Sequence, residues 1–173
     1  MIYIFGWAFD PPHVGHTAIV KSILAKKHPE KIIIIPSSER DDKKYNVMDE
    51  HRLAMLRIFV DEINKSNISV TLTKEESAQE NSNEKTKQIL RSSGWQEQEK
   101  VIIDDYFVHN WKGEMITRDV DLYAREKYGD DIVHIFGTDT LESMPSWDSE
   151  KYALTKVPKL FVPRFDWEKS DSH

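Results

Sequence analysis

Two histidines, His13 and His16, enclose Gly15 where an apolar segment gives way to a helical pattern. The apolar segment, residues 1–5, is followed by a loop with two consecutive prolines, and His16 falls on the first turn of the expected helix. A helix N-terminus offers backbone N–H groups and the positive end of its dipole to an anion. Two imidazoles beside it can donate hydrogen bonds to phosphate oxygens and can carry positive charge next to a polyphosphate. Such a loop suits in-line attack on a nucleotide phosphate, where the protein positions the reactants and stabilises charge without a nucleophilic side chain.

A second polar cluster follows another apolar segment, residues 132–136. Gly137 gives a ligand close access to the end of that segment, and Asp139 offers a carboxylate that suits ribose hydroxyls. Asp139 could instead cap the short helix that follows, or do both. Trp147 lies farther along, and a core anchor is one role for its indole.

The elements that must position these residues follow from the apolar pattern. Five short stretches rich in Ile, Val or Phe are typical of strands buried on both faces of a parallel sheet. They are residues 1–5, 31–36, 68–72, 132–136 and 159–162. Helical spacing lies between them, so we expect an α/β fold: a single-domain Rossmann-like open parallel sheet with helices on both faces. Such sheets bind ligands beyond the carboxyl ends of their strands, where both polar clusters fall.

Three helices are expected between these strands. One covers residues 16–27, and a second is capped by Asp49. Thr117 is expected to cap a third, which carries Asp119 and Asp121 in its first turn and ends at Gly129.

One polar insertion interrupts the expected single domain, residues 1–173, at about residues 75–105. Ile89, Leu90 and Trp95 are its main apolar residues. We expect a surface helix over residues 84–91, a short strand at 101–103, and a solvated excursion overall, with a lid or an oligomer contact as the alternative.

The composition narrows the class of protein. The chain has 173 residues, 39% hydrophobic and 31% charged, the balance of an ordinary globular domain. It contains no cysteine, which excludes disulfides and thiolate chemistry. A net charge of −6 argues against non-specific nucleic-acid binding. No apolar run approaches the roughly 20 residues that cross a bilayer, and no basic leader precedes the first strand. We therefore expect a cytoplasmic protein with no membrane or nucleic-acid partner and leave a homo-oligomer open.

The first cluster resembles the HxGH signature of the nucleotidylyltransferase superfamily. The adjoining sequence Phe-Asp-Pro-Pro, residues 9–12, looks like that of the nicotinate and nicotinamide mononucleotide adenylyltransferases. The resemblance implies an enzyme of NAD biosynthesis that transfers AMP from ATP to a pyridine mononucleotide, with Mg²⁺ carried on the ATP phosphates and pyrophosphate released. His13 and His16 would bind the phosphates and stabilise the transition state. The other nucleotide-binding residues that it implies are Gly6, Trp7, Ala8, Phe9, Asp10 and Gly15.

The second cluster is similar to the same family. The resemblance implies that Gly137 and Asp139 contact the adenosine and that Trp147 stacks on the pyridine ring. It implies further acceptor or phosphate contacts by Thr117, by Lys43 and Lys44 in a loosely matching charged loop, and by Arg164 after the last strand. A solvated charge run is the alternative for the two lysines. Arg52 is expected to act indirectly, through structure.

The sequence departs from the family pattern in two places. The family usually has Gly-Gly-Ser/Thr-Phe where this chain has Gly6-Trp7-Ala8-Phe9, which changes the shape of the acceptor or triphosphate site. The family's C-terminal Ser/Thr-rich stretch ending in Ile-Arg is not found, so we expect either a fragment with weak ATP affinity or a different triphosphate contact. Another acceptor, such as phosphopantetheine or a cytidylyltransferase substrate, is one alternative function. A non-catalytic nucleotide-binding module is the other.

Overall fold

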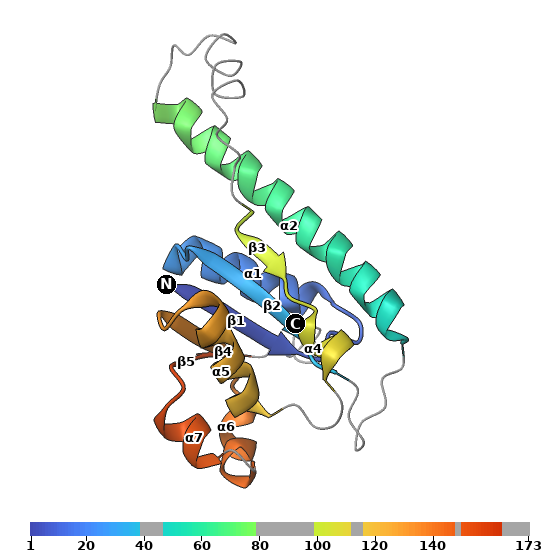
Figure 1. Ribbon diagram of the computed structural model, residues 1–173. Coiled ribbons are helices and arrows are strands. Elements are labelled where there is room, and N and C mark those ends of the chain that lie inside the picture. The colour runs from blue at the N-terminus through green and yellow to red at the C-terminus, as the bar shows by residue number, and fades with distance from the viewer. Residues whose placement is uncertain (39–46, 79–98, 112–115, 148–149, 164–173) are drawn as a thin grey trace, which may run out of the picture.

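Five parallel strands form one sheet in the order β3-β2-β1-β4-β5 (Figure 1). The computed structural model describes residues 1–38, 47–78, 99–111, 116–147 and 150–163, except the side chains of 67–78 and 150. The strands are β1 (Ile2–Trp7), β2 (Lys31–Pro36), β3 (Val101–Ile103), β4 (Ile132–Gly137) and β5 (Lys159–Val162). Every neighbouring pair is parallel. The predicted open parallel sheet is confirmed.

Helices cover both faces of this sheet. They are α1 (Val14–Lys27), α2 (Asp49–Ala78), α4 (Tyr106–Asn110), α5 (Thr117–Tyr128), α6 (Thr140–Ser143), the 3-10 helix η1 (Met144–Ser146) and α7 (Glu150–Thr155). Alternate residues of β1 point to opposite faces, as strand geometry requires. Tyr3 and Phe5 pack with α1 and α2, whereas Ile2 and Ile4 pack with α4 and α5. The predicted three-layer arrangement follows from this alternation.

The four consecutive isoleucines of β2 show why these segments lack a polar face. Ile32 and Ile34 join the core under α1 and α2, and Ile33 and Ile35 join the core under α4 and α5. All four side chains are fully buried. A central strand covered on both faces therefore needs an unbroken apolar run.

The strand expected at residues 68–72 was a wrong prediction, because those residues belong to α2. Their sequence, Ile-Ser-Val-Thr-Leu, has the alternation and β-branching of a strand. Tertiary context overrides this local preference, because another segment pairs with the sheet. The place beside β2 is taken by β3, in the register Ile32↔Val101. Asn64 of α2 fixes that edge: its amide donates to the Val101 carbonyl at 2.8 Å and accepts from the Val101 N–H at 3.1 Å.

The expected insertion at 75–105 overlaps α2 at its start and β3 at its end. The fully buried side chain of Val101 places that end in the core. The helix expected over 84–91, with Ile89, Leu90 and Trp95, lies outside the described residues.

Two details of α5 also differ from expectation. Ile116 occupies the N-cap and makes no side-chain capping bond, while Thr117 is the first helical residue and not the cap. Asp119 lies in the first turn, but Asp121 lies beyond it and is fully buried. The predicted end at Gly129 is correct, and its φ of 91° is one that glycine adopts readily.

The strand order reverses between β1 and β4, because the chain adds β2 and β3 on one side of β1 and then β4 and β5 on the other. Open α/β sheets bind ligands beyond the carboxyl ends of strands at such a point. Trp7 ends β1 and Gly137 ends β4, so these two residues mark the expected ligand-binding point. Among the helices that the structure describes, none is long and apolar enough to cross a membrane.

Candidate active site

The two histidines of the first motif form the N-terminal cap of α1. His13 is the N-cap, and its Nδ1 accepts a hydrogen bond from the Gly15 N–H at 3.1 Å. The Nδ1 of His16 accepts from the His13 N–H at 3.1 Å, which completes a capping box. Ser or Thr with Glu or Gln usually plays these parts. Gly15 is required, because a Cβ there would lie 2.9 Å from Cε1 of His13.

These caps determine how the imidazoles can act. A ring nitrogen that accepts a hydrogen bond carries no proton, so each neutral ring holds its proton on Nε2. The ring centroids of His13 and His16 are 3.8 Å apart with planes inclined at 36°. The capping bonds therefore leave Nε2 of each ring as the position from which it can donate to a ligand.

An aromatic cluster holds the His16 ring in place. Its neighbours are Phe9, Trp7 and Phe5, at centroid distances of 4.9, 5.5 and 6.0 Å. His16 is only 5% exposed, whereas His13 is exposed. Phe9 is itself buried and has a φ of 49°, an unusual backbone conformation for a bulky residue. The loop after β1 is thus shaped around one face of His16.

The second motif lies against the first through Trp7. A Cβ on Gly137 would come within 3.2 Å of the Trp7 ring and would collide with the Asp139 carboxylate. Asp139 occupies the N-cap position of α6 but makes no side-chain capping bond. The turn is held by Thr140, whose hydroxyl donates to the Gly137 carbonyl at 2.6 Å. The carboxylate therefore folds back over the end of β4, beside the switch point.

Arg52 ties the loops of this edge together. Its guanidinium is fully buried and donates to the carbonyls of Ala8 at 2.9 Å and Ser37 at 2.7 Å, and to the Asp49 carboxylate at 2.6 Å. The loops after β1 and β2 are thereby fastened to the start of α2. This is the structural role expected for Arg52. Asp49 begins α2 and is the acidic partner in the contact.

The remaining predicted residues belong to several different segments of the chain. Gly6 is exposed at the end of β1, and Asp10 is partly buried in the loop that follows. Trp147 ends η1, is partly buried, and packs on Phe136 at a centroid distance of 5.9 Å. Thr117 begins α5 and is also partly buried. Lys43, Lys44 and Arg164 lie outside the described residues.

One polar group near the site was not anticipated. Asp121, expected to interact with the helix dipole, instead contacts His134 of β4, Arg125 of α5 and Tyr152 of α7. His134, which interrupts the apolar run of β4, was a sequence signal, whereas the polar sequence of α5 gave none for Asp121. Neither sequence pattern indicates that Asp121 and His134 are in contact.

Comparison with known proteins agrees with this geometry. The sequence profile of a family described as "Cytidylyltransferase-like" matches residues 4–169. A protein of Albidiferax ferrireducens named "Probable nicotinate-nucleotide adenylyltransferase" is 41% identical over 58 residues, 33% of this chain and 29% of that protein. A protein of Chlorobaculum tepidum with the same name is 26% identical over 172 residues, 98% of this chain and 71% of that protein.

The fold is shared with a solved structure, the nicotinic acid mononucleotide adenylyltransferase of Plasmodium falciparum complexed with NaAD. It superposes with a TM-score of 0.65 at 18% identity, covering 94% of this chain and 63% of that chain. The chain thus spans less than two thirds of the length of the Albidiferax protein and of the Plasmodium chain.

The profile match includes the histidine pair, Arg52, and the Gly137 turn. The relatives carry the name that the HxGH motif and its flanking residues predicted. The predicted resemblance is confirmed at this level, and the chain belongs to the cytidylyltransferase-like family.

Proposed function

We propose that this protein transfers the adenylyl group of ATP to nicotinate mononucleotide, or to its amide counterpart, and releases pyrophosphate. The observation that carries the proposal is the pair of capped imidazoles of His13 and His16 at the N-terminus of α1. They lie at the same edge of the sheet as the Gly137–Asp139 turn, and Trp7 bridges the two motifs. One nucleotide crossing this edge would meet phosphate donors at one end and a carboxylate at the other.

The reaction needs little covalent participation by the protein. A phosphate oxygen of the acceptor attacks the α-phosphorus of ATP and forms the new P–O bond. The bond from that phosphorus to the oxygen bridging to the β-phosphate breaks, and pyrophosphate leaves. A phosphate monoester loses its second proton with a pKa of about 6, so near neutral pH the nucleophile needs no general base. Donors aimed at the developing charge are then the main contribution.

His13 and His16 supply those donors through Nε2–H. Because the cap bonds fix both rings before substrate arrives, little reorganisation is needed in the transition state. Gly6 and the loop residues 7–10 would line the nucleotide, and Asp139 would accept from ribose hydroxyls. Mg²⁺ belongs to the substrate in this proposal, carried on the ATP phosphates, from which it takes several of its ligands.

The acceptor would bind on the side of α5 and η1. Trp147 offers an indole face to the pyridine ring, and Thr117 at the start of α5 offers a hydroxyl to the ring substituent. Lys43, Lys44 and Arg164 remain proposed phosphate or acceptor contacts. The names of the Albidiferax and Chlorobaculum relatives support nicotinate mononucleotide as the acceptor to test first.

The test is pyrophosphate release with Mg²⁺, using ATP or CTP as donor against nicotinate mononucleotide, nicotinamide mononucleotide and phosphopantetheine. CTP belongs in the panel because the matching family is described as cytidylyltransferase-like. We expect release with ATP and a pyridine mononucleotide. Release only with phosphopantetheine or only with CTP would replace the proposed function. A folded protein that binds ATP but releases nothing with any acceptor would support a binding module instead.

A further inference from the structure

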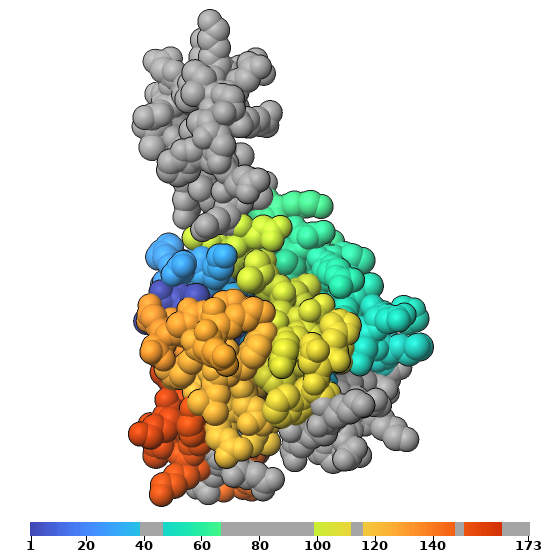
Figure 2. All heavy atoms as spheres, viewed as in Figure 1, coloured from blue at the N-terminus to red at the C-terminus, as the bar shows by residue number. Residues whose placement is uncertain are grey.

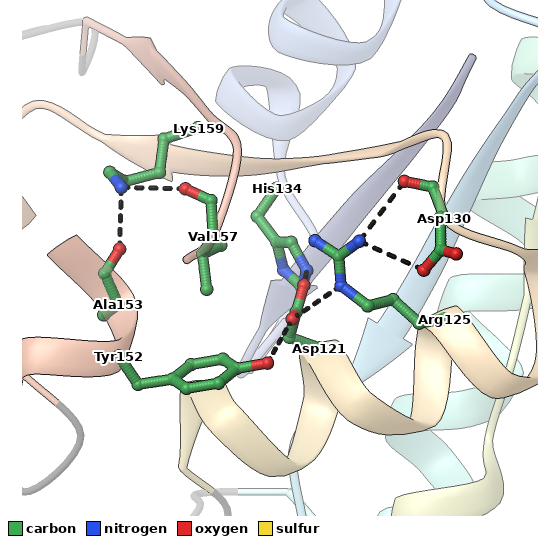
Figure 3. A network of polar contacts seen from close by, with 8 residues as sticks. All are labelled: Asp121, Arg125, Asp130, His134, Tyr152, Ala153, Val157 and Lys159. Carbon is green, nitrogen blue, oxygen red and sulfur yellow. Dashed lines mark hydrogen bonds and ion pairs between the residues drawn. The ribbon is translucent and has the colours of Figure 1, made fainter. Parts of the chain in front are cut away.

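A buried carboxylate on α5 gathers contacts from three elements. The side chain of Asp121 is fully buried and accepts from the Tyr152 hydroxyl at 2.8 Å and from Arg125 Nε at 2.9 Å, and its other oxygen lies 2.9 Å from His134 Nε2 (Figure 3). Tyr152 belongs to α7, Arg125 to α5 and His134 to β4. We call Asp121, Arg125, His134 and Tyr152 the Asp121 network.

This network fixes the geometry in which α5, β4 and α7 meet. Burial alone would raise the pKa of Asp121, but hydrogen bonds from His134, Arg125 and Tyr152 outweigh it and lower the pKa to about 2. The carboxylate is therefore ionised at neutral pH. Buried ion pairs are often no more stabilising than apolar side chains of the same shape, whereas their directional bonds fix how elements meet.

Each element in the network leads directly to a residue of the proposed site. Thr117 precedes Asp121 by four residues, one helical turn, and so shares its face of α5. His134 precedes Gly137 by three residues on β4. Tyr152 follows Trp147 by five residues, and α7 packs against η1, which Trp147 ends. The Asp121 carboxylate is thus the point where the acceptor-side elements join.

A second polar anchor holds α7 from its other end. Lys159 of β5 donates from Nζ to the carbonyls of Ala153 at 2.6 Å and Val157 at 2.8 Å (Figure 3). It also donates to the Leu154 carbonyl at 3.1 Å. These oxygens lie at and just beyond the C-terminal turn of α7, where helix carbonyls lack intrahelical partners. α7 is thus held to β5 by Lys159 at its C-terminal end and to α5 by the Tyr152 hydroxyl.

The opposite flank of α5 provides a comparison within the same molecule. There Asp104, which follows β3, accepts from the hydroxyls of Tyr123 at 3.0 Å and Tyr128 at 2.6 Å and from Lys127 Nζ at 3.0 Å. Figure 2 shows the β3–α4 segment beside α5 on this flank. This second cluster fastens the same helix to the sheet but does not include β4, η1 or α7.

We propose that Tyr152 is a positioning residue for the acceptor: through the Asp121 network it sets the place of Trp147 and Thr117 relative to the end of β4. The inference rests on the proposed function for its kinetic test. Tyr152 itself need not touch the substrate, because it acts through α7 and α5.

The matched variants are Tyr152→Phe and Tyr123→Phe, each of which removes one hydroxyl from a partly exposed tyrosine that bonds a buried aspartate. For Tyr152→Phe we expect the KM for the pyridine mononucleotide to rise about fivefold, since the hydrogen bond that ties α7 to the charged Asp121 carboxylate is lost. The KM for ATP and kcat should stay within about twofold. For Tyr123→Phe all three parameters should stay within about twofold, although thermal stability falls.

Amide hydrogen exchange gives a readout that does not depend on turnover. Tyr152→Phe should increase exchange in residues 117–121 and 150–155 but not in 101–110, while Tyr123→Phe should do the reverse. Unchanged exchange in 117–121 and 150–155, or an acceptor KM equal to the wild-type value, overturns the inference even where the wild type is active. A wild type without turnover defeats the proposed function, and the exchange pattern then decides the positioning role alone.

Discussion

The candidate site has a nucleotide side, with His13 and His16, and an acceptor side, with Thr117 and Trp147. The hydrogen bonds that organise these two sides span different distances along the chain. On the nucleotide side, the bonds that orient His13 and His16 join residues two and three positions apart. On the acceptor side, the bonds from Asp121 reach 13 residues to His134 and 31 residues to Tyr152. The bonds that orient the histidines are local, although Arg52 fastens the same loop to α2 from 44 residues away. The bonds of Asp121 instead join α5, β4 and α7, three elements that are separate in the sequence.

This difference has a consequence for function. Because the bonds that orient His13 and His16 come from adjacent residues, substitutions in α5, β4 or α7 should leave the two imidazoles in place. An acceptor side that depends on the mutual placement of three elements can change its ligand through substitutions that never touch that ligand. Phosphate transfer and acceptor choice should therefore respond to different mutations.

The largest effect should come from His16→Ala on the nucleotide side. Removing one preorganised donor to a developing charge lowers turnover by about 10²–10³-fold. The lost capping bond costs about 1 kcal/mol of stability, and the space left among Phe5, Trp7 and Phe9 adds a further loss, so the fold must be checked separately. The measurement is pyrophosphate release under saturating substrates, with circular dichroism to check the fold.

His109→Ala, which removes an exposed histidine on α4, serves as the control and should retain wild-type turnover. If His16→Ala kept full activity, the His pair would not be the phosphate-binding centre. The assignment of phosphate transfer to the nucleotide side would then be wrong.

A middle-sized effect should come from Asp121→Asn on the acceptor side. The folded pKa of Asp121 is about 2, below its ordinary value of 3.8. Because the pKa of Asp121 is lower in the folded than in the unfolded protein, its ionised form stabilises the fold at pH values above the unfolded pKa. This stabilisation is lost as the pH falls from about 4 to 2. The shift corresponds to on the order of 2 kcal/mol at pH 7, about half of which should be lost by pH 3.

Urea unfolding of the wild type and Asp121→Asn at pH 7 and pH 3 measures this directly. The variant should be less stable at pH 7, and the difference should narrow by about 1 kcal/mol at pH 3. ATP binding at pH 7 should be retained, because the capped histidines belong to the other side. A stability difference that is the same at both pH values would show that the charge of Asp121 is not what the network requires.

The sequence predicted the features that adjacent residues determine better than those that depend on distant contacts. The position of His16 on the first helical turn was predictable, because cap positions and helix starts are set by adjacent residues. The strands at 31–36 and 159–162 were predictable from apolar runs. The extension of α2 through 68–72 was not, because it depends on which segment fills the place beside β2.

Long-range polar partners were the least predictable. Periodicity indicates that a position is buried but not which distant side chain it meets. The sequence therefore predicted a helix-dipole role for Asp121, whereas the structure shows its side chain in contact with His134. Asn64 likewise gave no sign that it would bond both backbone groups of Val101.

The smallest effect should come from Gly137→Ala, at the junction of the two sides. A Cβ there would come within 3.2 Å of the Trp7 ring and would push the Asp139 carboxylate away from the end of β4. Overpacking of this kind costs about 1 kcal/mol or more. If Asp139 holds the ribose of ATP, the KM for ATP should rise about threefold while the KM for the acceptor changes less.

Gly6→Ala is the matched control for stability, because it alters the neighbouring strand and its added Cβ would meet only the Ile35 carbonyl at an ordinary 3.8 Å. The double variant Gly137→Ala/Asp139→Ala separates the two causes. It should recover part of the lost stability, because the displaced carboxylate is gone, but not the ATP affinity. An unchanged KM for ATP in both Gly137 variants would remove Asp139 from the nucleotide site. Such a result would leave Trp7 as the contact through which the histidine pair and the β4 turn influence each other.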